Sequence, residues 1–136
     1  MKISASVKSA FQLHEVTVET ENKVKPISIS PKPEGFGSSI NGGELLFLSL
    51  ATCFCNDLYR EASKRNMKID SVQVIVSGEF GSEGEPAKNI TYEVDVKAND
   101  HSDAEIWDLI KTVDKLAEIH NTLRQGINVE LKKSRL

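Results

Sequence analysis

Apolar and polar positions alternate along the first thirty residues, which is the pattern of half-buried strands. The apolar positions fall in three patches: Ile3, Ala5 and Val7; Val16 and Val18; Ile27 and Ile29. We therefore predict three short strands, with a hairpin turn at residues 21–23. The prolines and glycines of PKPEGFGSS, residues 31–39, then predict a loop.

A long helix is expected after this loop, with Asn41 as its N-cap and Glu44 completing a capping box. From residue 45 to residue 55 only Ser49 and Thr52 are polar, so this half should be buried on nearly all sides. From residue 56 to residue 66 the pattern is amphipathic. It places Leu58, Tyr59 and Ala62 inward, and Asp57, Arg60, Glu61, Lys64 and Arg65 outward. A chain of 136 residues has little material to enclose such a helix, which predicts an obligate dimer.

The second half of the chain continues with two antiparallel strands, a helix and a last strand. The strands span residues 71–80 and 89–98, where alternate positions are apolar. Residues 102–119 have helical apolar spacing, with Ser102 or Asp103 as the cap. Ile127, Val129 and Leu131 alternate again and predict the last strand. The order is β-β-β-α-β-β-α-β, an α+β fold in one domain spanning residues 1–136.

Composition narrows the functional classes. The 17 basic and 20 acidic residues give a net charge of -3 without a Lys/Arg block, so nucleic acid is not an expected partner. No signal peptide and no apolar run of membrane-spanning length is recognised, so we expect a cytoplasmic protein with no membrane partner. The two cysteines, Cys53 and Cys55, form neither a disulfide framework nor a zinc site. We expect no metal and no cofactor.

The segment GFGSSINGGELLFLSLATCFCNDL, residues 35–58, resembles the OsmC/Ohr (osmotically inducible protein C, organic hydroperoxide resistance) family. In that family an Asn-Pro-Glu turn opens a long helix whose reactive cysteine follows two alanines. The matching residues here are Asn41, Leu45, Ala51, Thr52, Cys53 and Phe54. KRNMKIDSVQVIVSGEF, residues 64–80, and NTLRQGINVEL, residues 121–131, resemble later segments of a divergent family member.

The resemblance implies an intertwined homodimer with active sites at the subunit interface. It also implies that a cysteine thiolate attacks an organic hydroperoxide, that a second cysteine closes a disulfide, and that an external dithiol reduces it. Cys53 is at the position of the attacking cysteine. Attack requires a thiolate, which needs a nearby cation or hydrogen-bond donor.

Three parts of the family pattern are missing. The resolving cysteine falls on Ala117, and the activating glutamate falls on Gly43. The first arginine of the chain is Arg60, so the N-terminal strands have none; Lys23 or Lys25 can supply only a point charge. Cys55 does not replace the resolving cysteine, because residues i and i+2 of a helix lie about 200° apart.

Each candidate residue has a functional and a structural interpretation. Cys53 is either the reactive thiol or a small apolar residue of a buried helix, and free cysteine is among the most buried residue types. His120, three residues after Ala117, either reaches the Cys53 pocket as a base or ion-pair partner, or stabilises a helix C-terminus.

Two hypotheses follow for an OsmC-like stress protein. The first is a one-cysteine organic hydroperoxide reductase, in which Cys53 acts, His120 assists and an external thiol resolves the sulfenic acid. The second is a non-catalytic OsmC-like dimer that binds a small apolar ligand at the subunit interface. What surrounds the sulfur of Cys53 distinguishes them.

Overall fold

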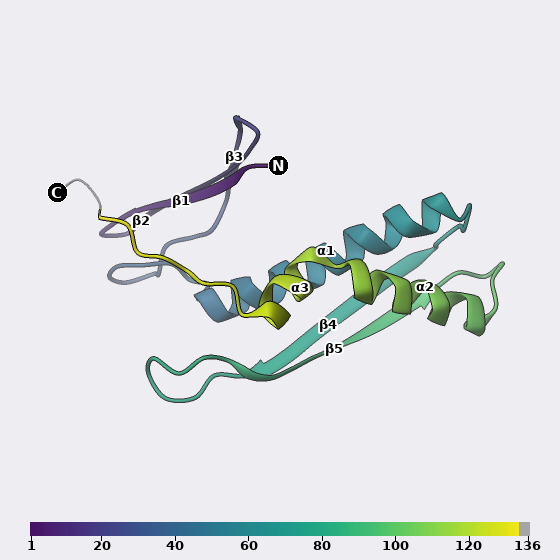
Figure 1. The fold of residues 1–136 in the computed structure, drawn as a ribbon. Helices are drawn as coiled ribbons and strands as arrows, with labels where there is room; N and C mark the ends of the chain where they lie inside the picture. The colour runs from purple at the N-terminus through teal and green to yellow at the C-terminus, as the bar shows by residue number, and fades with distance from the viewer. Residues whose placement is uncertain (134–136) are drawn as a thin grey trace. The chain divides into compact units, whose positions relative to one another are not determined.

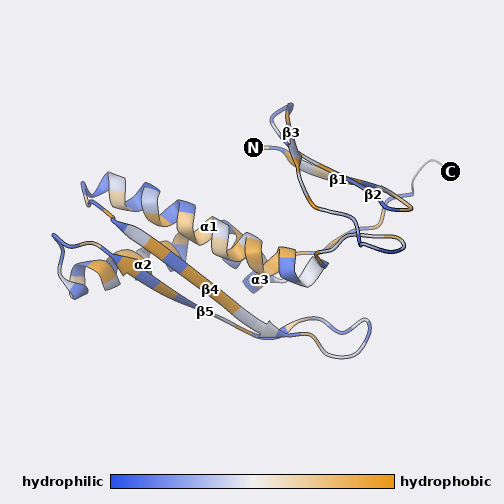
Figure 2. Ribbon diagram, turned by 180° about the vertical axis from the view of Figure 1, so that it is seen from behind, coloured by the Kyte–Doolittle hydropathy of each residue, from blue (hydrophilic) through white to orange (hydrophobic). Residues whose placement is uncertain are grey.

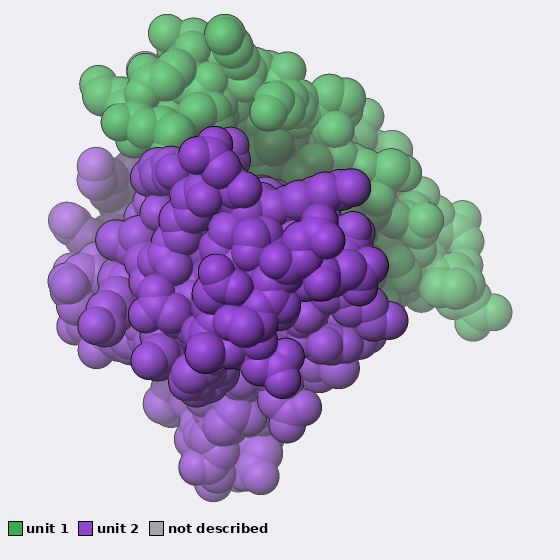
Figure 3. Space-filling model, turned by 90° about the vertical axis from the view of Figure 1, so that its right-hand side faces the viewer, with its two compact units in different colours: residues 1–45 green, residues 46–136 purple. Residues whose placement is uncertain are grey.

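The computed structural model describes residues 1–133 and divides the chain into two compact units, residues 1–45 and 46–136 (Figure 3). Within the described residues, no helix has the length and apolar character needed to cross a membrane.

Unit 1 is an antiparallel sheet of three strands in the order β1-β2-β3. The strands are β1 (Ile3–Ala10), β2 (Leu13–Thr20) and β3 (Lys23–Ile27), which confirms the three predicted strands. Glu21 and Asn22 connect β2 to β3 with φ values of 47° and 64°. Two positive φ values in a two-residue loop define a type I′ turn, whose twist matches that of the flanking strands. The predicted hairpin turn is therefore confirmed.

One face of this sheet is apolar and uncovered. The register pairs Val7 with Val16 and Val16 with Ile27, so these three side chains share a face. Ile3 and Val7 remain 64% and 60% exposed. A three-stranded sheet needs a buried apolar face to be stable, and within unit 1 nothing packs on this face.

Helix α1 (Gly42–Lys64) begins at the predicted capping box. The Glu44 amide donates to Asn41 Oδ1 at 2.8 Å, and the Asn41 amide donates to Glu44 Oε2 at 3.0 Å. Two of the free N–H groups at the helix start are thus satisfied, and the predicted cap is confirmed.

Unit 2 has two layers (Figure 1). One layer is the antiparallel hairpin of β4 (Ser71–Glu79) and β5 (Lys88–Lys97). The other contains α1, α2 (Asp103–Leu116) and α3 (Glu118–Gln125). Apolar positions alternate along both strands, as predicted (Figure 2). The inward side chains pack against the helices. The fully buried large side chains are Phe54, Leu58, Leu109 and Val113.

The burial prediction for the polar half of α1 was wrong at three positions: Asp57 and Glu61 are buried, and Tyr59 is exposed. Leu48, in the apolar half, is exposed in the single chain, where a second subunit was expected to supply the cover. Both buried carboxylates form ion pairs with more exposed cations, which offsets the cost of their burial. Arg60 Nη1 lies 2.9 Å from Asp57 Oδ1, and Lys64 Nζ lies 2.7 Å from Glu61 Oε1.

The C-terminal region also differs from the prediction. The single helix expected over residues 102–119 is broken at Ala117, whose φ of -62° and ψ of 107° are extended. Ser102 is the N-cap of the first part, in a complete capping box. Residues 127–133 form no strand, because they pair with no strand of the described chain. The side chains of Val129 and Leu131 are almost fully exposed.

Candidate functional site

The sulfur of Cys53 lies between two carboxylates. Asp57 is one helical turn further along α1, on the same face, and its Oδ2 atom is 3.7 Å from Cys53 Sγ. Glu118, the first residue of α3, brings its Oε2 atom to 3.9 Å from the same sulfur. No cation is paired with the sulfur among the described residues of unit 2.

The break between α2 and α3 places Glu118 beside the thiol. Ala117 is the C-cap of α2 and the N-cap of α3, and it is fully buried in the cluster on which Cys53 packs. The extended backbone of Ala117 starts a new helix, so the first-turn N–H groups are free. The backbone amide of Ile119, in this first turn, lies near Cys53 and lowers the pKa of the thiol.

The electrostatics of the cluster favour the protonated thiol. Burial raises the pKa of Cys53, and the charges of Asp57 and Glu118 raise it further, whereas the Ile119 amide lowers it less than these effects combined. Burial and the charge of Glu118 also raise the pKa of Asp57, against the opposing charge of Arg60. The surroundings of the sulfur therefore disfavour the thiolate form of Cys53.

Cys53, Asp57 and Glu118 offer three ligand atoms within 4.8 Å of one another. A metal would require a deprotonated sulfur, which this environment disfavours, and Asp57 is already paired with Arg60 at 2.9 Å. We assign no metal to this cluster.

Cys55 lies apart from this cluster. It lines a separate shallow pocket with Ala51, Thr52, Asn56 and Val74. Both cysteines are free thiols, in agreement with their separation around the helix.

His120 is buried at a different place in unit 2, with 5% of its surface exposed. Its ring centroid is 4.7 Å from that of Tyr92 and 5.8 Å from that of Phe54. Neither ring nitrogen has a hydrogen-bond partner among the described residues, so His120 makes no hydrogen bond to Cys53. Burial and the charge of Arg124 lower the pKa of His120, against the charge of Asp114, so the ring is neutral near pH 7.

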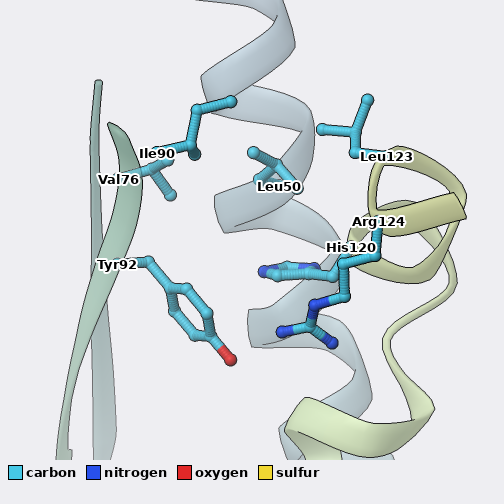
Figure 4. Close-up of a pocket in the computed structure, with 7 residues that line it drawn as sticks. All are labelled: Leu50, Val76, Ile90, Tyr92, His120, Leu123 and Arg124. Atoms are coloured by element: carbon cyan, nitrogen blue, oxygen red, sulfur yellow. The ribbon is translucent and has the colours of Figure 1, made fainter. Parts of the chain in front are cut away.

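His120 faces a cavity of about 230 Å³ (Figure 4). The residues that line the cavity are Leu50, Val76, Ile90, Tyr92, His120, Leu123 and Arg124. At its polar end, Arg124 Nη2 is 2.6 Å from Asp114 Oδ1, and the Tyr92 hydroxyl donates to the same carboxylate. This network fixes the orientation of Tyr92 and Arg124 beside the histidine ring.

The family model for OsmC-like proteins matches residues 35–132, which include α1, the β4-β5 hairpin and both later helices. The chain belongs to the OsmC-like family. No curated protein sequence matches it.

Solved structures of OsmC-like proteins share this fold. An OsmC-like protein from Mycoplasma pneumoniae is 22% identical, with a TM-score of 0.61, over 90% of this chain and 86% of that one. An organic hydroperoxide resistance protein from Elizabethkingia anophelis is 16% identical, with a TM-score of 0.61, over 91% and 89%. The organic hydroperoxide resistance protein OhrB of Bacillus subtilis is 17% identical, with a TM-score of 0.55, over 97% of both chains. The predicted α+β, OsmC-like fold is confirmed.

In this OsmC-like chain, the predicted site residues occupy two distinct places: Cys53 is in the carboxylate cluster and His120 is in the cavity wall. Sequence reasoning missed Asp57, Glu118 and Arg124. The position of Asp57, four residues after Cys53, was a readable signal. The roles of Glu118 and Arg124 depend on the helix break at Ala117, which the apolar spacing did not reveal.

Proposed function

We propose that this chain is an OsmC-like homodimer that binds a small, largely apolar molecule and does not use Cys53 as a peroxide-reducing thiolate. The observation that carries the proposal is the pair of carboxylates at 3.7 Å and 3.9 Å from the Cys53 sulfur. A negative charge beside a thiol disfavours the thiolate, which is the nucleophilic form.

The uncovered apolar surfaces support the homodimer. In unit 1 these are the exposed side chains of Ile3 and Val7 on the apolar face of the sheet. In unit 2 the exposed Leu48 on α1 belongs to the half-helix that the sequence expects to be enclosed. A second copy of the chain can bury both surfaces, and exposed apolar patches are typical of such interfaces.

The cavity beside His120 supports the binding role. Four of its seven lining residues are aliphatic, and its polar groups are gathered around His120 and Arg124 (Figure 4). Apolar walls with a few oriented polar groups are typical of small-molecule sites. The net charge of -3 without a basic block argues against a nucleic-acid partner. The cytoplasmic location stays a prediction from the sequence.

The proposal is tested by the reactivity of the thiol in the native dimer. At pH 7 we expect iodoacetamide to modify Cys53 much more slowly than it modifies a free cysteine, and we expect no consumption of cumene hydroperoxide with dithiothreitol above that of Cys53→Ser. The matched control is Cys55→Ser, which removes the other thiol and should leave both results unchanged. Rapid alkylation of Cys53 together with peroxide turnover would overturn the proposal.

A second candidate function is a one-cysteine organic hydroperoxide reductase. It is supported by the Ile119 amide, which lowers the pKa of Cys53, and by structural neighbours that are named organic hydroperoxide resistance proteins. In this mechanism the thiolate of Cys53 attacks the peroxide, a sulfur–oxygen bond forms while the oxygen–oxygen bond breaks, and the alkoxide takes a proton and leaves as an alcohol. One external thiol condenses with the sulfenic acid, which releases water and leaves a mixed disulfide on Cys53, and a second thiol displaces the Cys53 thiolate and leaves as the external disulfide. His120, the base that the sequence suggested, makes no hydrogen bond to Cys53 in this structure.

The two functions predict opposite results for the same variants. The reductase predicts that Cys53→Ser abolishes hydroperoxide turnover and that Cys55→Ser retains it. The binding protein predicts that the wild type, Cys53→Ser and Cys55→Ser are indistinguishable in this assay.

A further inference from the structure

The imidazole of His120 is buried without hydrogen bonds. The residue is 5% exposed, and both Nδ1 and Nε2 lack a partner among the described residues. A neutral imidazole has one N–H donor and one acceptor nitrogen, and buried polar groups in native proteins are almost always satisfied. The missing partner is therefore expected in the adjoining cavity, toward which the ring is directed (Figure 4).

The size of the cavity limits this partner to a small molecule. Its volume of about 230 Å³ equals roughly eight water molecules at ~30 Å³ each. The walls formed by Leu50, Val76 and Ile90, with Leu123 opposite, offer no hydrogen-bonding side chain. A molecule that fills this space buries a short hydrocarbon body against them.

The charge at the polar end of the cavity indicates the chemical class of the ligand's head group. Arg124 is the cation in the lining of the cavity. Its ion-pair partner Asp114 lies 2.6 Å from Arg124 Nη2 and also lines the neighbouring groove with Trp107 and Lys111. Arg124 donates three described hydrogen bonds: two from Nη1, to the Asp114 carbonyl and to Asn121, and one from Nη2 to the Asp114 carboxylate. A guanidinium has five N–H donors, and the Tyr92 hydroxyl is a further hydrogen-bonding neighbour of Arg124, so one N–H remains for a ligand.

We infer that this cavity binds a short-chain monocarboxylic acid, whose carboxylate accepts hydrogen bonds from the His120 ring and from a free N–H of Arg124. The hydrocarbon chain lies against the four aliphatic residues. The inference rests on the proposed binding function and names the class of its ligand.

The test is a titration of the protein with hexanoate. Binding is monitored through the NMR signals of the histidine rings. 1-Hexanol is the matched probe, with the same chain length and no charge. We expect hexanoate to shift the ring signals of His120 and not those of His14 or His101, and to bind about tenfold more tightly than 1-hexanol, because a charge-assisted hydrogen bond distinguishes the two.

Two variants separate the head-group contact from general effects. Arg124→Gln removes the charge and should weaken hexanoate binding about tenfold while leaving 1-hexanol binding unchanged. Lys111→Gln is the matched control, since it removes one cation from the neighbouring groove, and it should bind hexanoate as the wild type does. The thermal midpoint of each variant verifies that it is folded.

Three results would overturn the inference. They are equal affinity for hexanoate and 1-hexanol, unchanged hexanoate affinity in Arg124→Gln, and no shift of the His120 signals by hexanoate. The first two leave the proposed binding function intact, because the cavity still takes an apolar molecule. The proposed function fails separately, through rapid Cys53 alkylation with peroxide turnover.

Discussion

Cys53 and Glu118 are 65 residues apart in the chain, yet the sulfur of the first lies 3.9 Å from the carboxylate of the second. The contact exists because α3 begins at Glu118, directly after the helix break at Ala117. It places a negative charge where a thiol-dependent peroxidase requires a positive charge or a hydrogen-bond donor. The family resemblance predicts a reactive Cys53, whereas this contact disfavours its thiolate form.

Removing the charge of Glu118 should make Cys53 more reactive. In Glu118→Gln one of the two carboxylates that raise the thiol pKa is lost, so the thiolate fraction increases at a given pH. Because Glu118 is exposed, solvent screens its charge, and we expect iodoacetamide alkylation at pH 8 to rise about twofold to tenfold. Glu93→Gln, at an exposed position of β5, is the control and should alkylate as the wild type does. An unchanged rate in Glu118→Gln would contradict the electrostatic account of Cys53.

His120 should make the protein less stable as the pH falls. Its folded pKa is lowered from 6.5, mainly by burial, so between the lowered value and 6.5 the unfolded chain binds more protons than the folded one. The free energy of unfolding therefore falls on acidification through this window. His120→Phe keeps an aromatic ring against Phe54 and Tyr92 but does not titrate. Urea unfolding at pH 7.5 and pH 5.5 measures the free energy of unfolding. Its decrease between the two pH values should be smaller in the variant than in the wild type, and equal decreases would contradict this role.

The secondary structure was largely predictable because it depends on local patterns. The capping box of Asn41 and Glu44 and the hairpin turn at Glu21 and Asn22 both involve neighbouring residues, and both were predicted from the sequence. The last strand was not formed because a strand requires a pairing partner, which residues 127–133 do not find in the described chain.

The candidate site was less predictable because it depends on tertiary contacts. Cys53 was recognisable through the family resemblance, but the carboxylate of Glu118 reaches it only through the break at Ala117. The extended backbone at Ala117 interrupts a sequence whose apolar spacing is compatible with a continuous helix. A periodic pattern indicates which face is buried and does not indicate where the backbone turns.

Gly78 should be intolerant of a side chain because Phe47 occupies the space beside it. A Cβ atom at Gly78 would lie 2.7 Å from Phe47 Cζ and 3.2 Å from Ile90 Cγ1, closer than van der Waals contact allows. We expect Gly78→Ala to lower the free energy of unfolding by about 1–3 kcal/mol, the usual cost of overpacking. Gly42→Ala is the matched control: nothing lies within 4 Å of its added Cβ, and it should be neutral or slightly stabilising. Urea unfolding compares the two, and equal stabilities would show that Phe47 moves aside at no cost.

The apolar face of unit 1 should decide the oligomeric state. Val7 is 60% exposed and shares this face with Val16 and Ile27, whereas Lys8 points to the opposite face because side chains alternate along β1. If a second copy of the chain covers the apolar face, Val7→Gln places an amide in an apolar interface without a partner and weakens the dimer. Lys8→Gln changes the neighbouring position on the other face and should leave assembly unchanged.

Analytical ultracentrifugation should find the wild type and Lys8→Gln at twice the chain mass of 15.0 kDa, with Val7→Gln shifted toward the monomer at micromolar concentration. A monomeric wild type would remove the homodimer from the proposal, whereas equal dimerisation of both variants would place the interface on another surface.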